Sequence, residues 1–191
     1  MLENELDDDE LIRKISSKDL IAFQQLVERH KVFIYNTCYN LIGNDQQAEE
    51  TAQDVFLQVY KSAGSFLHKS KVSTWIYRIA VNRSLNIIRH NKRSRWIKSL
   101  TGMETEASGG EDPDKQLEKK EMIELLKAAV DSLPEKQRVA FILNKYENLA
   151  PKEIGEILGI STNSVEVRIH RAKINLQKKL VSLLKNKPEK L

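Results

Sequence analysis

Apolar residues recur at intervals of three and four through most of this chain, which predicts amphipathic helices rather than strands. The predicted helices cover, in chain order, about residues 17–42, 46–63, 71–92, 114–132, 135–146, 151–158 and 162–185. The side chains expected to face the core of the first three helices are Leu20, Phe23, Leu26, Val27, Ile34, Cys38, Leu41, Ala48, Ala52, Val55, Phe56, Val59, Val72, Ile76, Ile79, Ala80 and Ile87. The chain is therefore predicted to be all-α.

Residues 101–114 interrupt this periodicity. They read TGMETEASGGEDPD, which is rich in glycine, small polar residues and acid, as is typical of a flexible linker. We therefore predict two small helical domains joined by a flexible acidic linker. The predicted boundaries are an acidic N-terminal arm at 1–16, a first domain at 17–98, the linker at 99–116, and a second domain at 117–187 that carries a helix-turn-helix.

Composition narrows the class of protein. Hydrophobic residues make up 40% of the chain, which is enough for folded cores. No apolar run approaches the roughly 18 residues that are needed to cross a bilayer. The N-terminal residues are strongly acidic, the wrong sign for a secretory signal. Cys38 is the single cysteine and lies on an apolar helical face, so we interpret it as a small buried hydrophobe. We expect a cytoplasmic protein without direct membrane insertion.

Charge is segregated along the chain. The formal net charge is only +4, yet residues 55–103 contain ten Lys or Arg and no carboxylate. Phe66, Trp75, Tyr77 and Trp96 are interleaved with these basic residues. A long positive stretch with aromatic rings suits a polyanion whose bases are free to stack, which indicates unpaired nucleic acid.

The helix predicted at 71–92 places this chemistry on one face. A stripe of cations and amides lies roughly 100° from the apolar stripe, with Trp75 at its head. Its members are Arg78, Asn82, Asn86, Arg89 and Arg93. Trp75 is open to two interpretations, a core residue at a helix junction or a ring that stacks on a base. Arg83 falls on the apolar stripe, so we expect it to pair with a carboxylate of the preceding helix.

Residues 152–165 have the spacing of a helix-turn-helix. Gly159 permits a left-handed turn, Ile160 fills the angle, and Ser161 caps the second helix. The face of that helix opposite its apolar stripe is expected to meet duplex DNA in the major groove. Its residues are Asn163, Ser164, Val167, Arg168, His170 and Arg171.

No motif for chemistry accompanies these surfaces. The chain lacks a GxxxxGK phosphate loop, an HExxH motif and a GxSxG motif. The four histidines and one cysteine do not have zinc-ligand spacing, so His170 is expected at the surface or facing phosphate. We predict no enzymatic activity, no catalytic residues, no metal and no cofactor.

Four motifs together resemble a known family. They are AEETAQDVF at 48–56, STWIYRIAVN at 73–82, LPEKQR at 133–138, and the helix-turn-helix. In this order and spacing they are similar to bacterial RNA polymerase sigma factors of the extracytoplasmic-function (ECF) type, in the sigma-70 family. That group keeps only the second and fourth conserved sigma regions, and the resemblance spans about residues 17–184.

The resemblance implies partners and roles. Glu49, Glu50 and Asp54 would lie on the acidic helix that docks on core RNA polymerase. The loop from Phe66 through Lys69 to Lys71 would capture a flipped base of the −10 element, and Trp75, Arg78, Asn82 and Arg83 would help melt and hold it. The helix-turn-helix would recognise the −35 element, the acidic linker would run through the polymerase channels, and an anti-sigma factor would be a further partner.

Two positions depart from the family pattern. Glu166 stands where an acidic residue is unusual, so the resemblance does not say which −35 base sequence this chain would prefer. Ala150-Pro151 replaces the usual Ser or Thr cap. Two alternatives remain: a stand-alone helix-turn-helix regulator that binds a duplex palindrome, and a regulatory mimic that docks on polymerase without initiating.

Overall fold

The computed structural model describes residues 6–101 and 115–185, and within them all regular structure is helical. The elements, in chain order, are α1 (Asp8–Ser16), α2 (Leu20–Ile42), α3 (Asp45–Ser62), the 3-10 turn η1 (Ala63–Ser65), α4 (Val72–Thr101), α5 (Lys115–Asp131), α6 (Glu135–Lys145), α7 (Pro151–Leu158) and α8 (Thr162–Lys185). The predicted all-α class is confirmed. The predicted linker falls mainly on residues 102–114, which lie outside the described part of the chain.

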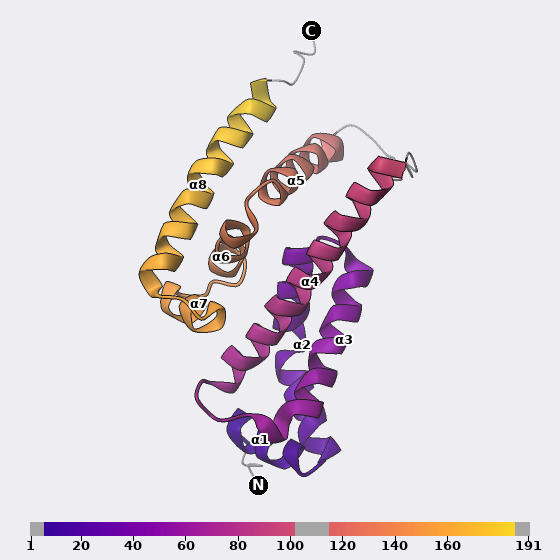
Figure 1. Ribbon diagram of the computed structural model, residues 1–191, viewed down its shortest axis with the longest axis vertical. Coiled ribbons are helices and arrows are strands. Elements are labelled where there is room, and N and C mark those ends of the chain that lie inside the picture. The colour runs from indigo at the N-terminus through magenta and orange to yellow at the C-terminus, as the bar shows by residue number, and fades with distance from the viewer. Residues whose placement is uncertain (1–5, 102–114, 186–191) are drawn as a thin grey trace.

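The first four helices form one group. α2, α3 and α4 lie side by side along their length, and α1 covers one end of the three (Figure 1). The side chain of Asp19 caps α2 by accepting hydrogen bonds from the backbone N–H groups of Ile21 and Ala22 at 2.9 and 3.0 Å. On α3, the apolar face predicted from the sequence is buried throughout. This group therefore has the three-helix body that the periodicity predicted.

α1 was not predicted as a helix, because its acidic neighbours obscured a short apolar stripe. Leu11, Ile12 and Ile15 are almost fully buried against α2 and η1. A capping box starts the helix. In it the Glu10 N–H donates to the Asp7 carboxylate at 2.7 Å, and the Asp7 N–H donates to the Glu10 carboxylate at 3.2 Å. The acidic arm is thus partly a packed element of the first group.

The last four helices form a second group around α8. α5, α6 and α7 all pack on α8, and its Val165, Ile169, Ala172 and Leu176 are buried, as the periodicity predicted. The bounds of α7 and α8 coincide with the predicted ones. The sequence therefore predicted these two helices closely, since Pro151 and Gly159 mark the ends of α7 and Ser161 marks the start of α8.

The two groups pack against each other along α4 and α2. α7 lies against α4, and α6 lies against α2 (Figure 1). One continuous cluster of buried side chains crosses this boundary, from Leu11 on α1 to Ile169 on α8. We call this boundary the seam. α4 packs against α2 and α3 and also against α7, so it is buried on two sides and carries two apolar faces.

Three details of the predicted core are corrected by this packing. Leu20, at the first position of α2, is 65% exposed, and Ala22 lies inside instead. On α4, Ile88 is buried while Ile87 is only half-buried. Tyr77 and Val81 are also buried, and no inward stripe was predicted for them. The second group covers that side of α4, a contact that periodicity in α4 alone could not reveal. None of the described helices is long and apolar enough to span a bilayer.

Candidate nucleic-acid interface

The predicted stripe on α4 forms a single exposed face. Its members Arg78, Asn82, Asn86, Arg89 and Arg93 are all exposed side chains. They follow one another at three- and four-residue intervals, so the helix places them in a row. This row of guanidinium and amide groups can donate hydrogen bonds to phosphate oxygens and to the edges of unpaired bases. We call it the α4 stripe.

An aromatic cluster stands at the head of the α4 stripe. The Phe66 ring lies 4.7 Å from the Trp75 ring and 4.7 Å from the His68 ring, between centroids. Phe66 and Trp75 are both half-buried. Each ring therefore has a packed side and an open side, which fits both interpretations of Trp75 at once. Lys69 and Lys71 are exposed in the same loop.

The loop is tied to the N-terminal helix. His68 has a left-handed backbone with φ 51°, and its Nδ1 lies 2.8 Å from the Asp9 carboxylate. Asp9 belongs to α1, so this element helps to hold the loop that follows η1. Sequence reasoning missed the contact, because the two partners are far apart in the chain and neither side chain forms part of a motif.

Arg83 does not belong to the exposed row. Its guanidinium donates to the Asp54 carboxylate at 2.8 Å and to the Gln58 side chain at 3.5 Å, so it points toward α3. The predicted pairing with a carboxylate of the preceding helix is confirmed. Glu49, Glu50 and Asp54 are exposed on α3, which gives that helix an acidic outer face.

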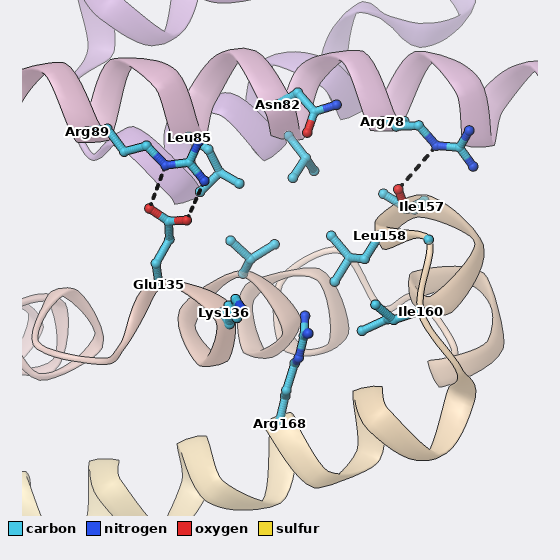
Figure 2. A pocket seen from close by; sticks show the side chains of 13 residues that line it. Arg78, Asn82, Leu85, Arg89, Glu135, Lys136, Ile157, Leu158, Ile160 and Arg168 are labelled. Carbon is cyan, nitrogen blue, oxygen red and sulfur yellow. Dashed lines mark hydrogen bonds and ion pairs between the residues drawn. The ribbon is translucent and has the colours of Figure 1, made fainter.

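Two arginines of the α4 stripe are bonded to the second group (Figure 2). Arg78 donates to the backbone carbonyls of Glu156 at 2.6 Å and Ile157 at 3.3 Å. Arg89 donates through two nitrogens to the Glu135 carboxylate, at 2.7 and 3.1 Å. This hydrogen bonding to Arg89 holds the pKa of Glu135 below its usual value. The sequence held no sign that these side chains have partners within the chain.

The turn between α7 and α8 has the geometry of a helix-turn-helix. Gly159 ends α7 in the left-handed region with φ 65°, and Ile160 is half-buried against the core. Ser161 Oγ accepts from the backbone N–H of Ser164 at 3.2 Å, which is the predicted cap. Gly155 lies so close to the turn that a Cβ there would meet the Ile160 carbonyl at 2.8 Å. The structure therefore confirms the two helices, the turn and the cap of the predicted helix-turn-helix.

The start of α7 differs from a usual cap. Ala150 has no side-chain acceptor, so only half of a capping box is present. In that half the Ala150 N–H donates to the Glu153 carboxylate at 2.8 Å. Pro151 occupies the first helical position, where its missing N–H costs little. The helix thus starts without the Ser or Thr hydroxyl that the resemblance led us to look for.

The outer face of α8 carries the predicted duplex-reading residues. Asn163, Val167, His170 and Arg171 are exposed. Ser164 and Arg168 are half-buried, and Arg168 extends toward the seam, where it lines a cavity (Figure 2). Four of the six predicted residues are therefore free to meet DNA on one helix face. Glu166 is exposed beside them.

The cavity at the seam has a volume of about 500 Å³. Polar and apolar residues of α4 line one wall, and residues of α6, α7, the turn after α7 and α8 line the other. Among the described residues no group of three or more His, Cys, Asp and Glu is placed to hold a metal ion. Burial raises the pKa of Cys38 to about 11, so its thiol stays protonated at neutral pH.

Comparison with known proteins gives this arrangement its context. Residues 26–94 match the family description Sigma-70 region 2, and residues 123–176 match Sigma-70, region 4. The ECF RNA polymerase sigma factor SigW of Bacillus subtilis is 33% identical over 179 residues, covering 90% of this chain and 96% of that protein. The chain belongs to the ECF sigma factors of the sigma-70 family.

Other relatives agree with this assignment. The ECF RNA polymerase sigma-E factor of Escherichia coli K12 is 28% identical to this sigma factor over 193 residues, with 96% of this chain and 100% of that protein covered. The RNA polymerase sigma-H factor of Pseudomonas aeruginosa is 28% identical over 185 residues, with 93% and 96% covered.

Two solved structures share the fold. CnrH, in complex with the cytosolic domain of CnrY, aligns with a TM-score of 0.65 at 22% identity, covering 94% of this chain and 98% of that one. The sigma factor RpoE of Bartonella quintana, in complex with the anti-sigma factor NepR, aligns with a TM-score of 0.61 at 23% identity, covering 83% and 96%.

Proposed function

We propose that this sigma factor binds core RNA polymerase, recognises the −35 and −10 elements of its promoters, and promotes DNA opening for transcription initiation. One observation carries the proposal. Two separate exposed surfaces of different chemistry lie within the two matched sigma regions: a cationic row with aromatic rings on α4, and an exposed helix-turn-helix face on α8. Sigma factors are generally non-enzymatic initiation factors, and the polymerase performs the chemistry.

The −10 element is assigned to α4 and the loop before it. An unpaired strand offers phosphates and open base faces, and it is held best by cations beside stacking rings. The aromatic cluster of Phe66 and Trp75 would stack on a displaced base, with Lys69 and Lys71 on its phosphates. The amides of Asn82 and Asn86 would then hydrogen-bond base edges further along the strand.

The −35 element is assigned to α8 as duplex DNA. The N-terminal part of a recognition helix normally contacts base edges in the major groove, which suits Asn163 and Val167. Arg171 and His170 follow one turn later, where a guanidinium can bind guanine or phosphate. Glu166 would repel phosphate and accept from a cytosine amino group, so it would shape the −35 preference of this protein.

Core polymerase is assigned to the acidic face of α3. Glu49, Glu50 and Asp54 are exposed there, and Asp54 is already oriented by Arg83. An anti-sigma factor is a further expected partner, in line with the complex of the Bartonella quintana sigma factor named above. We expect the protein to act in the cytoplasm, where the polymerase is.

The test is run-off transcription with purified core polymerase on fragmented genomic DNA, with and without this protein. Discrete transcripts that require the protein would establish the function and yield the promoter sequence. The Asn82→Ala variant should impair opening while core binding persists. Tight binding to a palindromic duplex without core, together with no transcripts, would instead favour a stand-alone helix-turn-helix regulator.

A further inference from the structure

The loop assigned to −10 capture has little support of its own. Residues 67–70 follow η1 as irregular structure, and in the described part of the chain no hydrogen bond between backbone groups involves any of them. Leu67 is 71% exposed, so the loop does not bury its apolar side chain either. A segment with so few internal contacts rearranges easily. Contacts from elsewhere in the chain must therefore set its geometry.

His68 has the least favourable backbone in this loop. Its φ of 51° lies in the left-handed region, which residues other than glycine rarely adopt. Lys18 also has a positive φ, but its backbone N–H donates to the Ile15 carbonyl at 2.9 Å and closes the turn after α1. Among the backbone hydrogen bonds of the described residues, none supports His68 in this way. A left-handed residue persists only where surrounding contacts compensate for its strain.

Asp9 supplies the compensating contact. Its carboxylate lies 2.8 Å from Nδ1 of His68, and because an ionised carboxylate can only accept, the Nδ1–H group donates. The same imidazole ring lies 4.7 Å from the Phe66 ring, which lies 4.7 Å from the Trp75 ring, between centroids. The carboxylate therefore fixes the His68 ring and, through it, one side of the aromatic cluster.

Asp9 can hold the loop because α1 is itself firmly anchored. Three apolar side chains of α1 are almost fully buried against α2 and η1, as described above. The neighbouring Asp8 carboxylate accepts from Arg29 at 2.7 Å and lies 2.8 Å from Nε2 of His30, both on α2. Two adjacent carboxylates of α1 thus bind different parts of the first group: Asp8 binds α2, and Asp9 binds the loop.

A carboxylate at this place is unfavourable for nucleic-acid binding unless it has a structural role. The loop carries the exposed Lys69 and Lys71, and a negative charge so close to it repels a strand bound there. Removing that charge should tighten strand binding if repulsion is its only effect, and weaken it if Asp9 holds the loop. The side chains of His68 and Asp9 are 45% and 49% exposed, so their pair adds little to global stability. The two roles therefore predict opposite changes in affinity in a folded protein.

We propose that Asp9 is a positioning residue for −10 capture: through His68 it holds the loop and the aromatic cluster in the geometry that receives a displaced base. This rests on the −10 assignment of the loop made above. Asp9 need not touch the strand itself. α1 lies before residues 26–94, the part that matches Sigma-70 region 2, and by this contact it becomes part of the −10 site.

The test uses Asp9→Ala in the full-length chain, with Glu10→Gln as matched control. The control removes the same charge one residue away and keeps an acceptor for the Asp7 N–H, so the capping box persists. Each variant is assembled with core polymerase. The probe is the single non-template strand of the −10 region from a promoter that run-off transcription with the unmutated protein has identified, and its dissociation constant is measured by fluorescence anisotropy.

The Asp9→Ala holoenzyme should bind this strand about three- to tenfold more weakly than the Glu10→Gln holoenzyme, the loss expected for one hydrogen bond. Core association and the Tm should match those of the control. In a His68→Asn background, where asparagine tolerates the left-handed backbone, Asp9→Ala should cost less than about twofold, because its effect runs through His68.

Equal or tighter strand binding by the Asp9→Ala holoenzyme would overturn the proposal. A full three- to tenfold loss in the His68→Asn background would also overturn it, since Asp9 would then act by another route. Run-off transcription separates this failure from failure of the proposed function. Transcripts with the unmutated protein and no effect of Asp9→Ala would refute only the positioning role, whereas no transcripts would refute the −10 assignment on which it rests.

Discussion

Gly155 is the position where one added methyl group is expected to disturb the helix-turn-helix. It lies inside α7, and its own carbonyl accepts from the Ile160 N–H at 3.0 Å. A Cβ would meet the Ile160 carbonyl at 2.8 Å, and that oxygen belongs to the backbone of the turn. The turn must therefore move in a Gly155→Ala variant, because no flexible side chain is there to yield.

The magnitude follows from three contributions. Alanine is favoured over glycine in a helix interior by about 1 kcal/mol. Overpacking costs about 1–3 kcal/mol, and weakening the bond from Ile160 to Gly155 costs about 0.5–1.5 kcal/mol. The free energy of unfolding should thus fall by about 0.5–3.5 kcal/mol, which for a chain of this size lowers the Tm by about 1–14 °C.

The assay is urea and thermal unfolding followed by circular dichroism, with Gly64→Ala as control. Gly64 lies in η1 without a left-handed backbone, and a Cβ there would meet only the Ser16 Cβ at 3.9 Å, an ordinary van der Waals contact. The control should therefore stay close to the parent protein. A Gly155→Ala variant at least as stable as the parent would refute the argument, because the helix-propensity gain would then be unopposed.

Three further outcomes test the site assignments and the seam. Arg171→Ala should lower −35-dependent promoter binding by the holoenzyme about 5- to 150-fold, the loss of one guanine or phosphate contact, measured by titration on promoter duplexes. Asp54→Arg should abolish co-purification with core, while the loss of its exposed pair with Arg83 costs at most about 1 kcal/mol of stability. Burial is the main cause that raises the pKa of Glu147, so its charge opposes folding at neutral pH. Glu147→Gln keeps an acceptor for Asn40 and should stabilise the protein at pH 7, by an amount that shrinks as the pH falls toward 4.5 and the parent carboxyl protonates.

For each of these three predictions, one experimental result would contradict it. Lys173→Ala, on the same helix but outside the predicted reading face, should leave −35 binding within about twofold. A loss of affinity equal to that of Arg171→Ala would mean that Arg171 acts only through nonspecific charge attraction to DNA. Unchanged core association of Asp54→Arg would remove the acidic face of α3 from the polymerase interface. A Glu147→Gln variant less stable than the parent at pH 7 would mean that the carboxylate charge supports the seam.

Local signals in the sequence were sufficient to predict much of this fold. α7 and α8 were predicted to the residue, since Pro151, Gly159 and Ser161 mark their ends. The pairing of Arg83 with Asp54 could be predicted because a cation on an apolar stripe needs a nearby carboxylate, and the preceding helix offers one. Such inferences depend only on helix geometry and neighbours in the chain.

What escaped prediction involves contacts between distant segments. α1 was missed because its apolar stripe is very short and lies within acidic sequence. The burial of Tyr77 and Val81 depends on the second group, which lies beyond the linker in the chain. Likewise, the sequence identifies Arg78 and Arg89 as cations of the stripe but gives no acceptor. Arg78 bonds backbone carbonyls of α7, which carry no sequence signature, and Arg89 bonds Glu135, which lies far away in the chain.

The continuous cluster of buried side chains across the seam determines which parts of the protein unfold together. Cooperative units follow shared buried contacts rather than linker position. If the chain were cut within residues 102–114, each fragment would present an apolar strip to water, with Val81 on one and Val139 and Ile157 on the other. The two fragments should therefore recombine when mixed, with a dissociation constant that measures the strength of the seam directly.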